Sequence, residues 1–162
     1  MDYGINPQQL AVCVIRPALS YIGMHSLAAE QLVLGTALTE SLGMYVKQLG
    51  KGPALGLWQM EPATHDDILG NYVAYKPQLK LWLGGLSTSA RITDGALELI
   101  GNLFYGAAMC RIHYARGKDA LPASGNADGM ARMWKKVYNT VLGAGTVEKA
   151  LPHFRAACAV QA

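Results

Sequence analysis

Apolar residues recur every three to four positions through most of the chain, and stretches that alternate between apolar and polar residues are nearly absent. This spacing predicts amphipathic helices, and the rarity of alternation argues against β-strands. With 162 residues, the chain is long enough to build a hydrophobic core of its own. We therefore predict the all-α fold class, with residues 1–162 forming a single domain.

Capping residues predict where the helices begin. The segment after Ser26 is apolar around most of its circumference up to Gly43, so we expect it to be the central, buried helix of the fold. Pro17 is expected to kink or split the first helix, because its ring removes a backbone hydrogen bond. The predicted helix starts are Asn6 with Pro7, Ser26, Pro62, Pro77, Thr93 or Asp94, and Thr146.

Glycine and proline separate these helices. The run from Leu49 to Leu57 holds three glycines and a proline, which predicts a loop. In the second half of the chain we expect a long helix from Ala96 to about Ala115. A further helix near Ala127–Val137 is expected to bury Met130, Trp134 and Val137.

The charge and the hydropathy of the chain argue against a nucleic-acid partner and against a membrane span. Fourteen Lys and Arg residues against eleven Asp and Glu leave a net charge of +3. This small and scattered excess argues against a nucleic-acid binder. No apolar run approaches the roughly 18 residues of a membrane span, and the first residues lack the pattern of a signal peptide. We therefore expect a chain made without a signal peptide, with no membrane span and no nucleic-acid partner.

The cysteines and histidines do not predict a metal site. Cys13, Cys110 and Cys158 lie far apart, and the four histidines form no pair at the spacing of one helical turn. Metal-binding motifs need such spacing, so neither a metal nor another cofactor is expected. Free thiols among apolar neighbours are the simplest interpretation of the cysteines.

Glu40 stands out among the acidic residues. It falls in the last turn of the most apolar helix, directly before a glycine-rich loop. Partial burial and the negative end of a helix dipole both favour the protonated carboxyl. A carboxylic acid that stays protonated near neutral pH can protonate the leaving oxygen of a glycosidic bond. A solvent-facing glutamate at a helix end is the alternative interpretation.

Three segments in order resemble a known family. The run Thr39-Glu40-Ser41 is followed, sixteen positions after the glutamate, by Gly-Leu-Trp-Gln-Met starting at Gly56, and then by a Pro-x-Thr helix start. Downstream, a Trp-Lys-Lys-x-Tyr-Asn-Thr segment precedes two spaced glycines. This arrangement resembles soluble lytic transglycosylases and goose-type lysozymes, and is similar to lysozyme-like proteins of bacteriophages and prophages. It spans roughly Leu34 to Glu148, and it implies a lysozyme-like helical fold whose buried central helix ends at the catalytic glutamate.

The resemblance also implies roles for individual residues. Glu40 corresponds to the catalytic acid, and Gln59 to an amide that binds substrate. Tyr138 and Asn139 correspond to a pair that borders the same cleft, and Ser41 accompanies the catalytic glutamate as a further substrate contact. Simpler roles stay open for two of them: Gln59 could cap the helix that starts at Pro62, and Tyr138 could be a core residue with a satisfied hydroxyl.

The sequence departs from the family pattern at two places. A serine that usually precedes Gly-Ala in the loop is missing, because Leu49 to Pro53 reads Leu-Gly-Lys-Gly-Pro. Glu61 stands where transglycosylases tend to have an apolar residue and goose-type lysozymes an aspartate. As a second catalytic carboxylate, Glu61 would activate water for hydrolysis, whereas Glu40 alone would form an anhydro product. Glu61 could equally stabilise a helix N-terminus. Asp66 and Asp67 are further candidates, expected on an exposed helix face.

The resemblance implies a peptidoglycan-degrading enzyme that cleaves the β-1,4 bond between N-acetylmuramic acid and N-acetylglucosamine. Such an enzyme would act on cell-wall glycan strands, either carried in a virion beside other virion proteins or released at lysis as an endolysin. Two alternatives remain. One is a non-catalytic phage protein that keeps the fold for virion assembly or wall binding. The other is a helical nucleic-acid-binding regulator, which would rest only on the basic residues Arg132, Lys135 and Lys136.

Overall fold

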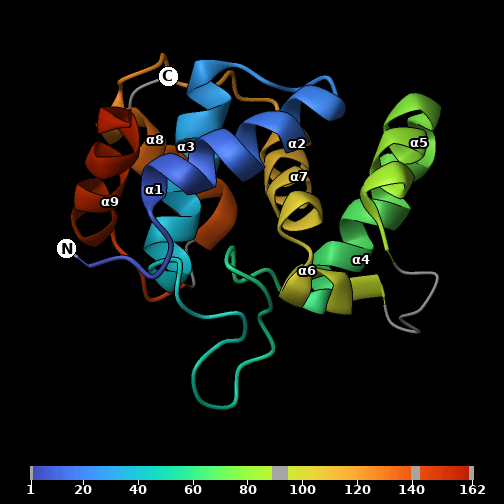
Figure 1. Cartoon of the computed structure of the whole chain (residues 1–162), viewed down its shortest axis with the longest axis horizontal. Helices are drawn as coiled ribbons and strands as arrows, with labels where there is room; N and C mark the ends of the chain where they lie inside the picture. The colour runs from blue at the N-terminus through green and yellow to red at the C-terminus, as the bar shows by residue number, and fades with distance from the viewer. Residues whose placement is uncertain (1, 89–94, 140–142, 161–162) are drawn as a thin grey trace.

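A computed structural model describes residues 2–88, 95–139 and 143–160, and within these ranges the chain is helical (Figure 1). The described part contains no strand, only isolated bridges that join Lys47 to Leu55 and Leu55 to Met60. The prediction of the all-α class is therefore confirmed. None of the helices in these ranges has both the length and the apolarity needed to cross a membrane.

The helical elements follow one another along the chain, with a long loop, residues 42–61, between α3 and α4 and a further connection, residues 116–126, between α7 and α8. The elements are α1 (Pro7–Gln9), η1 (Leu10–Ile15), α2 (Arg16–Tyr21), α3 (Leu27–Ser41), α4 (Pro62–Asn71), η2 (Val73–Tyr75), α5 (Pro77–Leu86), η4 (Gly95–Leu97), α6 (Glu98–Gly101), α7 (Leu103–Ala115), α8 (Ala127–Met133), η5 (Trp134–Asn139) and α9 (Val147–Ala159).

Side-chain caps begin several helices where the sequence predicted them. Asn6 accepts a hydrogen bond from the amide of Gln9 at 3.1 Å, and Ser26 accepts one from the amide of Ala29 at 3.1 Å. Helices α4 and α5 begin at the predicted prolines, and Thr146 caps α9. These side chains satisfy amide groups that have no partner inside the helix.

Pro17 was predicted to kink or split the first helix, but the helical backbone continues from Pro7 to Tyr21 and only its hydrogen-bonding register changes before the proline. Residues Leu10–Ile15 form a π-helical turn, and α2 starts at Arg16 with the proline in its first turn. The wider turn before Pro17, in which the amide of Arg16 donates to the carbonyl oxygen of Ala11, accommodates a residue that has no amide hydrogen to donate.

The predicted long helix from Ala96 to Ala115 is wrong, because Asn102 interrupts it. The backbone of Asn102 is extended (φ −103°, ψ 91°), and its side chain caps α7 by accepting the amide of Tyr105 at 3.0 Å. Its amide nitrogen donates to the carbonyl oxygen of Leu86 and to a carboxylate oxygen of Glu98, both at 2.8 Å. An asparagine that bonds locally in this way competes with the helical backbone. The predicted caps Thr93 and Asp94 lie outside the described residues.

Two apolar clusters share helix α7. The first surrounds α3 and includes residues of η1, α2, α8 and α9, and the second includes residues of α4, α5 and α6. Figure 1 shows α7 between these two groups of helices. Ala107, Cys110 and Tyr114 of α7 belong to the first cluster, while Met109 and Ile112 belong to the second. Helix α7 therefore holds the two halves of the fold together.

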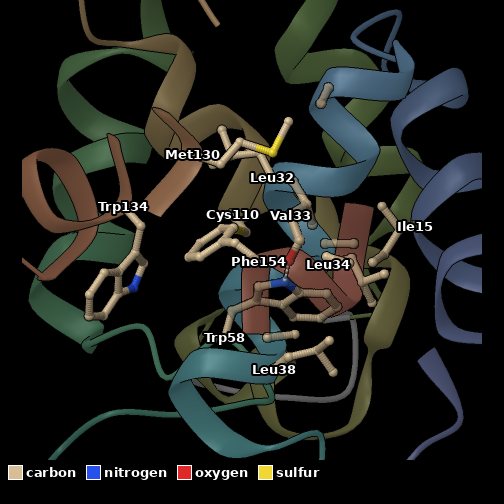
Figure 2. Packing of buried hydrophobic residues seen from close by; sticks show 14 of the residues in the cluster. Ile15, Leu32, Val33, Leu34, Leu38, Trp58, Cys110, Met130, Trp134 and Phe154 are labelled. Atoms are coloured by element: carbon tan, nitrogen blue, oxygen red, sulfur yellow. Dashed lines mark hydrogen bonds between the residues drawn. The ribbon is translucent and has the colours of Figure 1, made fainter. Parts of the chain in front are cut away.

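Helix α3 is the central helix that the sequence predicted, and it is buried from Ala29 to Leu38. Apolar side chains surround it on several sides (Figure 2). At Gly35 the ring of Phe154 from α9 comes so close that an added Cβ would lie 2.2 Å from a ring carbon. The absence of a side chain at Gly35 therefore lets α9 pack directly against α3.

We predict that Gly35→Ala destabilises the fold by about 1–2 kcal/mol, because the overpacking cost exceeds the helix propensity that alanine gains. Phe154 is fully buried and cannot move aside cheaply. The free energy of unfolding from chemical denaturation measures the effect. Gly84→Ala in α5 is the matched control, since an added Cβ there meets nothing within 4 Å, and it should stabilise slightly. Equal stabilisation by both variants would contradict the close packing of α3 and α9.

Candidate active site

One cavity brings together most of the residues that the sequence singled out for chemistry, but not Asp66 and Asp67. It has a volume of about 700 Å³ and opens between the end of α3, the loop that follows, the start of α4, α7, η5 and residues 143–145. The predicted site residues that line it are Glu40, Ser41, Gln59, Glu61, Tyr138 and Asn139. Positions separated by almost a hundred residues in the sequence thus face a common space.

The carboxyl of Glu40 is partly removed from water in the last turn of α3. The indole Nε1 of Trp134 donates a hydrogen bond to Oε1 of Glu40 at 2.7 Å. Burial raises the pKa of Glu40 to about 7, and the indole hydrogen bond opposes this rise. At neutral pH a large fraction of the carboxyl is therefore protonated, as a general acid requires.

Trp134 was predicted only as a core residue, and its contact with Glu40 was missed. The side chain is 2% exposed and begins η5. An added Cβ at Gly145 would lie 2.5 Å from the indole ring, so the absence of a side chain there leaves room for the indole beside Glu40. The sequence signals were that Trp134 begins the Trp-Lys-Lys-x-Tyr-Asn-Thr segment and lies four residues before Tyr138, which places both on one face of a helical segment.

Three of the predicted site residues hold the loop between α3 and α4 by its carbonyl groups. Nε2 of Gln59 donates to the carbonyl oxygen of Gly56 at 2.7 Å, and Oγ of Ser41 donates to that of Leu57 at 2.7 Å. The hydroxyl of Tyr138 donates to the carbonyl oxygen of Trp58 at 2.7 Å. Side chains from the loop, α3 and η5 thus bind three successive carbonyls.

The buried side of this loop is fixed by Trp58 and Gly56. Trp58 is 2% exposed, and its Nε1 donates to the carbonyl oxygen of Val33 in α3 at 3.0 Å (Figure 2). Gly56 has a φ of +73°, and an added Cβ would lie 2.2 Å from the carbonyl oxygen of Leu99. Only glycine meets both conditions, so this position places the turn close against α6.

Gln59 has a left-handed backbone, with a φ of 45°, at the edge of the cavity. Its Nε2 also donates to the carbonyl oxygen of Tyr45 at 3.2 Å. The alternative interpretation, that Gln59 caps the helix at Pro62, is not what the structure shows, because α4 has no side-chain cap. Both amide hydrogens are used within the protein, which leaves Oε1 as the group that can accept a hydrogen bond.

Tyr138 and Asn139 are positioned differently within η5. Burial raises the pKa of Tyr138 well above its usual value, and its hydroxyl is satisfied by Trp58. Oδ1 of Asn139 accepts a hydrogen bond from Nζ of Lys135 at 2.8 Å, and the same Nζ donates to the carbonyl oxygen of Gly143 at 2.8 Å. Lys135 thereby connects the end of η5 to the segment that follows.

The acidic residues of α4 divide into two groups. Glu61 is exposed, lines the cavity directly before α4 and makes no capping hydrogen bond there. Asp66 and Asp67 do not line the cavity and are exposed, as predicted. Asp66 pairs with Nδ1 of His65 at 2.8 Å, and Asp67 pairs with Arg116.

Sequence reasoning assigned no role to His113, which also lines the cavity. Burial and the neighbouring Arg116 lower the pKa of His113 to about 4. The side chain is therefore neutral under ordinary conditions. Its distance in sequence from every motif explains why no pattern pointed to it.

Neither a metal centre nor a known relative defines the site. Across residues 2–88, 95–139 and 143–160, no group of three or more His, Cys, Asp or Glu side chains could hold a metal ion. Comparisons with protein-family models, curated proteins and solved structures find no match for this chain. The chain is thus characterised by its helical fold and by a cavity with a carboxyl of raised pKa.

We predict that Glu40→Gln stabilises the fold at high pH. A carboxyl whose pKa rises from about 4.5 unfolded to about 7 folded contributes stability below pH 4.5, and this is lost as the pH rises through 7. Replacing this carboxyl by the neutral amide of glutamine should therefore raise the free energy of unfolding by up to about 3 kcal/mol at pH 8 and leave it unchanged at pH 4. Urea denaturation at the two pH values measures the difference.

Glu30, in the same helix α3, has a pKa shifted in the opposite direction from that of Glu40. Arg16 and His25 bind its carboxylate and lower its pKa despite burial. That stability is present above the unfolded pKa and is lost as the pH falls through the folded one, so Glu30→Gln should destabilise at pH 8. If Glu40→Gln lost stability at pH 8 as well, the burial of Glu40 would be contradicted.

We predict that Trp134→Phe raises the pKa of Glu40 above its value in the unchanged protein. The substitution keeps an aromatic ring but removes the indole N–H that stabilises the carboxylate. Carboxyl ¹³C chemical shifts followed through a pH titration report this pKa. Trp82→Phe, in α5 and away from the cavity, is the control and should leave it unchanged. A pKa of Glu40 that falls in Trp134→Phe would refute the assigned hydrogen bond.

Proposed function

We propose that this protein cleaves peptidoglycan at the β-1,4 bond between N-acetylmuramic acid and N-acetylglucosamine, with Glu40 as the general acid. The observation that supports this most is the half-buried carboxyl of Glu40, with a pKa of about 7, at the wall of a 700 Å³ cavity. The lysozyme-like resemblance of the sequence motifs agrees with it, since the residues to which it assigns a role all line that cavity: Glu40, Ser41, Gln59, Tyr138 and Asn139.

The first step of the proposed reaction uses the proton of Glu40. The carboxylic acid gives it to the glycosidic oxygen while the bond from that oxygen to the muramyl C1 breaks. Trp134 holds Oε1, so this oxygen has a fixed direction and the proton is carried on the other carboxyl oxygen. The hydrogen bond from the indole also stabilises the carboxylate that remains after the transfer.

Two completions of the reaction differ in their products. In the first, the oxygen of the muramyl C6 hydroxyl attacks C1 and its proton returns to Glu40, which yields anhydro ends. In the second, Glu61 removes a proton from water, whose oxygen attacks C1 and yields reducing ends. Glu61 lines the same cavity and is exposed to the solvent that supplies such a water.

Gln59 is proposed to recognise an acetamido group of the sugar. Its two amide hydrogens bind the carbonyl oxygens of Gly56 and Tyr45, so its Oε1 is the atom oriented for substrate. An acetamido N–H is a donor that suits this acceptor. Ser41 is proposed to act by positioning, since its hydroxyl is buried and donates to Leu57.

The basic residues of the sequence give little support to a nucleic-acid-binding regulator. Arg132 pairs with Asp128 at 2.7 Å, and Lys136 pairs with Asp119 at 2.7 Å. Lys135 bonds within η5 and to the segment that follows. Acidic partners offset the charge that a phosphate backbone would need.

We predict that Glu40→Gln abolishes the release of muropeptides from purified cell-wall sacculi, because an amide cannot donate a proton as an acid does. The fold stays intact, since the two side chains are nearly isosteric. For the unchanged protein, kcat/KM should fall as the pH rises above about 7, where Glu40 loses its proton. Mass spectrometry of the released fragments measures the activity and separates anhydro from reducing ends.

Controls distinguish catalysis from wall binding. Asp128→Asn changes an exposed carboxyl away from the cavity and should leave release unchanged. Glu61→Gln should abolish reducing ends if water is the nucleophile, and should leave anhydro ends unaffected otherwise. Absence of any release by the unchanged protein, where a lysozyme control is active, would overturn the proposal. Binding of sacculi without release, equal in Glu40→Gln, would identify a non-catalytic wall-binding protein.

A further inference from the structure

The imidazole of His113 is buried at the junction of the two apolar clusters. It belongs to α7, is 8% exposed and lines the cavity that contains Glu40. Its ring meets the ring of Tyr138 edge to face, with centroids 4.9 Å apart and planes at 69°. Packing against this aromatic ring fixes the orientation of the imidazole.

A hydrogen bond from Arg116 determines where His113 carries its proton. Nε of Arg116 donates to Nδ1 of His113 at 3.2 Å. A guanidinium has only donors, so Nδ1 must present a lone pair. The ring is then neutral, and its single N–H is on Nε2. The low pKa of His113, about 4, agrees with the neutral form.

Arg116 is itself anchored on the side of His113 away from Glu40. It pairs with Asp67, whose other carboxylate oxygen accepts a hydrogen bond from Asn71 at 2.7 Å. These three residues line a second, polar hollow of about 500 Å³, and His113 lies between this hollow and the first cavity.

The N–H of His113 lies on the side of the ring opposite Arg116, and His113 also lines the first cavity. The two nitrogens of an imidazole point in widely divergent directions, so a ring whose Nδ1 faces Arg116 turns Nε2 away from the second hollow. Within the described residues no group accepts a hydrogen bond from Nε2, and no buried side-chain nitrogen or oxygen lacks a partner. Nε2 is thus accessible from the cavity rather than enclosed.

We propose that His113 donates its Nε2–H to the carbonyl oxygen of an acetamido group on the bound glycan, with Arg116 as the residue that holds this tautomer. This inference rests on the proposed function. An acetamido carbonyl is the strongest neutral acceptor that such a glycan presents, and the cation behind the ring polarises the N–H toward it. The ring of Tyr138 provides an apolar surface beside the donor.

The tautomer can be tested in the protein without any ligand. Imidazole ¹⁵N chemical shifts at pH 6.5 should show His113 as neutral, with the proton on Nε2. Arg116→Met removes the donor to Nδ1 and should allow the Nδ1–H form to appear. A cationic ring, or a proton on Nδ1 in the unchanged protein, would overturn the inference whatever the enzyme activity is.

Contact with the glycan is tested by kinetics on soluble peptidoglycan strands. His113→Phe keeps an aromatic ring without a donor and should raise KM about fivefold with kcat within about twofold, as expected for one lost neutral hydrogen bond. His113→Gln places an amide N–H near the position of Nε2 and should keep KM within about twofold of the unchanged protein. His25→Gln, away from the cavity, is the control.

A titration with chitotetraose into Glu40→Gln gives a second readout that needs no turnover. Binding should shift the Nε2 resonance of His113. An active protein whose KM is unchanged in His113→Phe, or whose Nε2 resonance does not move on binding, would overturn this inference alone. A protein that neither cleaves strands nor binds the sugar would overturn the proposed function, and the sugar contact of His113 with it. Should His113→Phe not fold, the resonance shift decides.

Discussion

The properties of the site depend on the carboxyl of Glu40, which is largely shielded from water and accepts its hydrogen bond from the neutral indole of Trp134 rather than from a cation. Helix α3 carries two glutamates with opposite outcomes: Glu30 is bound by Arg16 and His25 and has a lowered pKa, whereas Glu40 has Trp134 and a raised one. Burial opposes ionisation in both. The charge of the partner therefore decides which glutamate serves as a structural anion and which can act as an acid.

The elements around Glu40 are held by contacts that the same few residues make with one another. Three carbonyls of the loop, from Gly56 to Trp58, accept hydrogen bonds from Gln59, Ser41 and Tyr138. Gly145 leaves room for the indole that binds Glu40. The motif residues thus fix the position of the loop between α3 and α4 against α3 and η5. This position determines which polar groups of the loop stay open to the cavity.

The sequence predicted the features that local interactions determine. Caps such as Ser26 and Thr146 act on amides three residues away, and the apolar circumference of α3 follows from its own residues. The break at Asn102 was missed although two of its hydrogen bonds, with Glu98 and Tyr105, are local; only the third, to the carbonyl oxygen of Leu86, has a partner distant in sequence. Trp134 and His113 were missed as site residues because their roles come from partners that only the tertiary structure brings near.

The cavity lies where the two apolar clusters meet, and polar groups gather there. Tyr138 packs against both clusters, and α7 contributes residues to each. The end of α3 brings Glu40 to this cavity, and the start of α4 brings Glu61 to it. His113 of α7 lines the same cavity, and its burial is tolerated because Arg116 satisfies Nδ1 and no buried side-chain nitrogen or oxygen of the described residues lacks a partner.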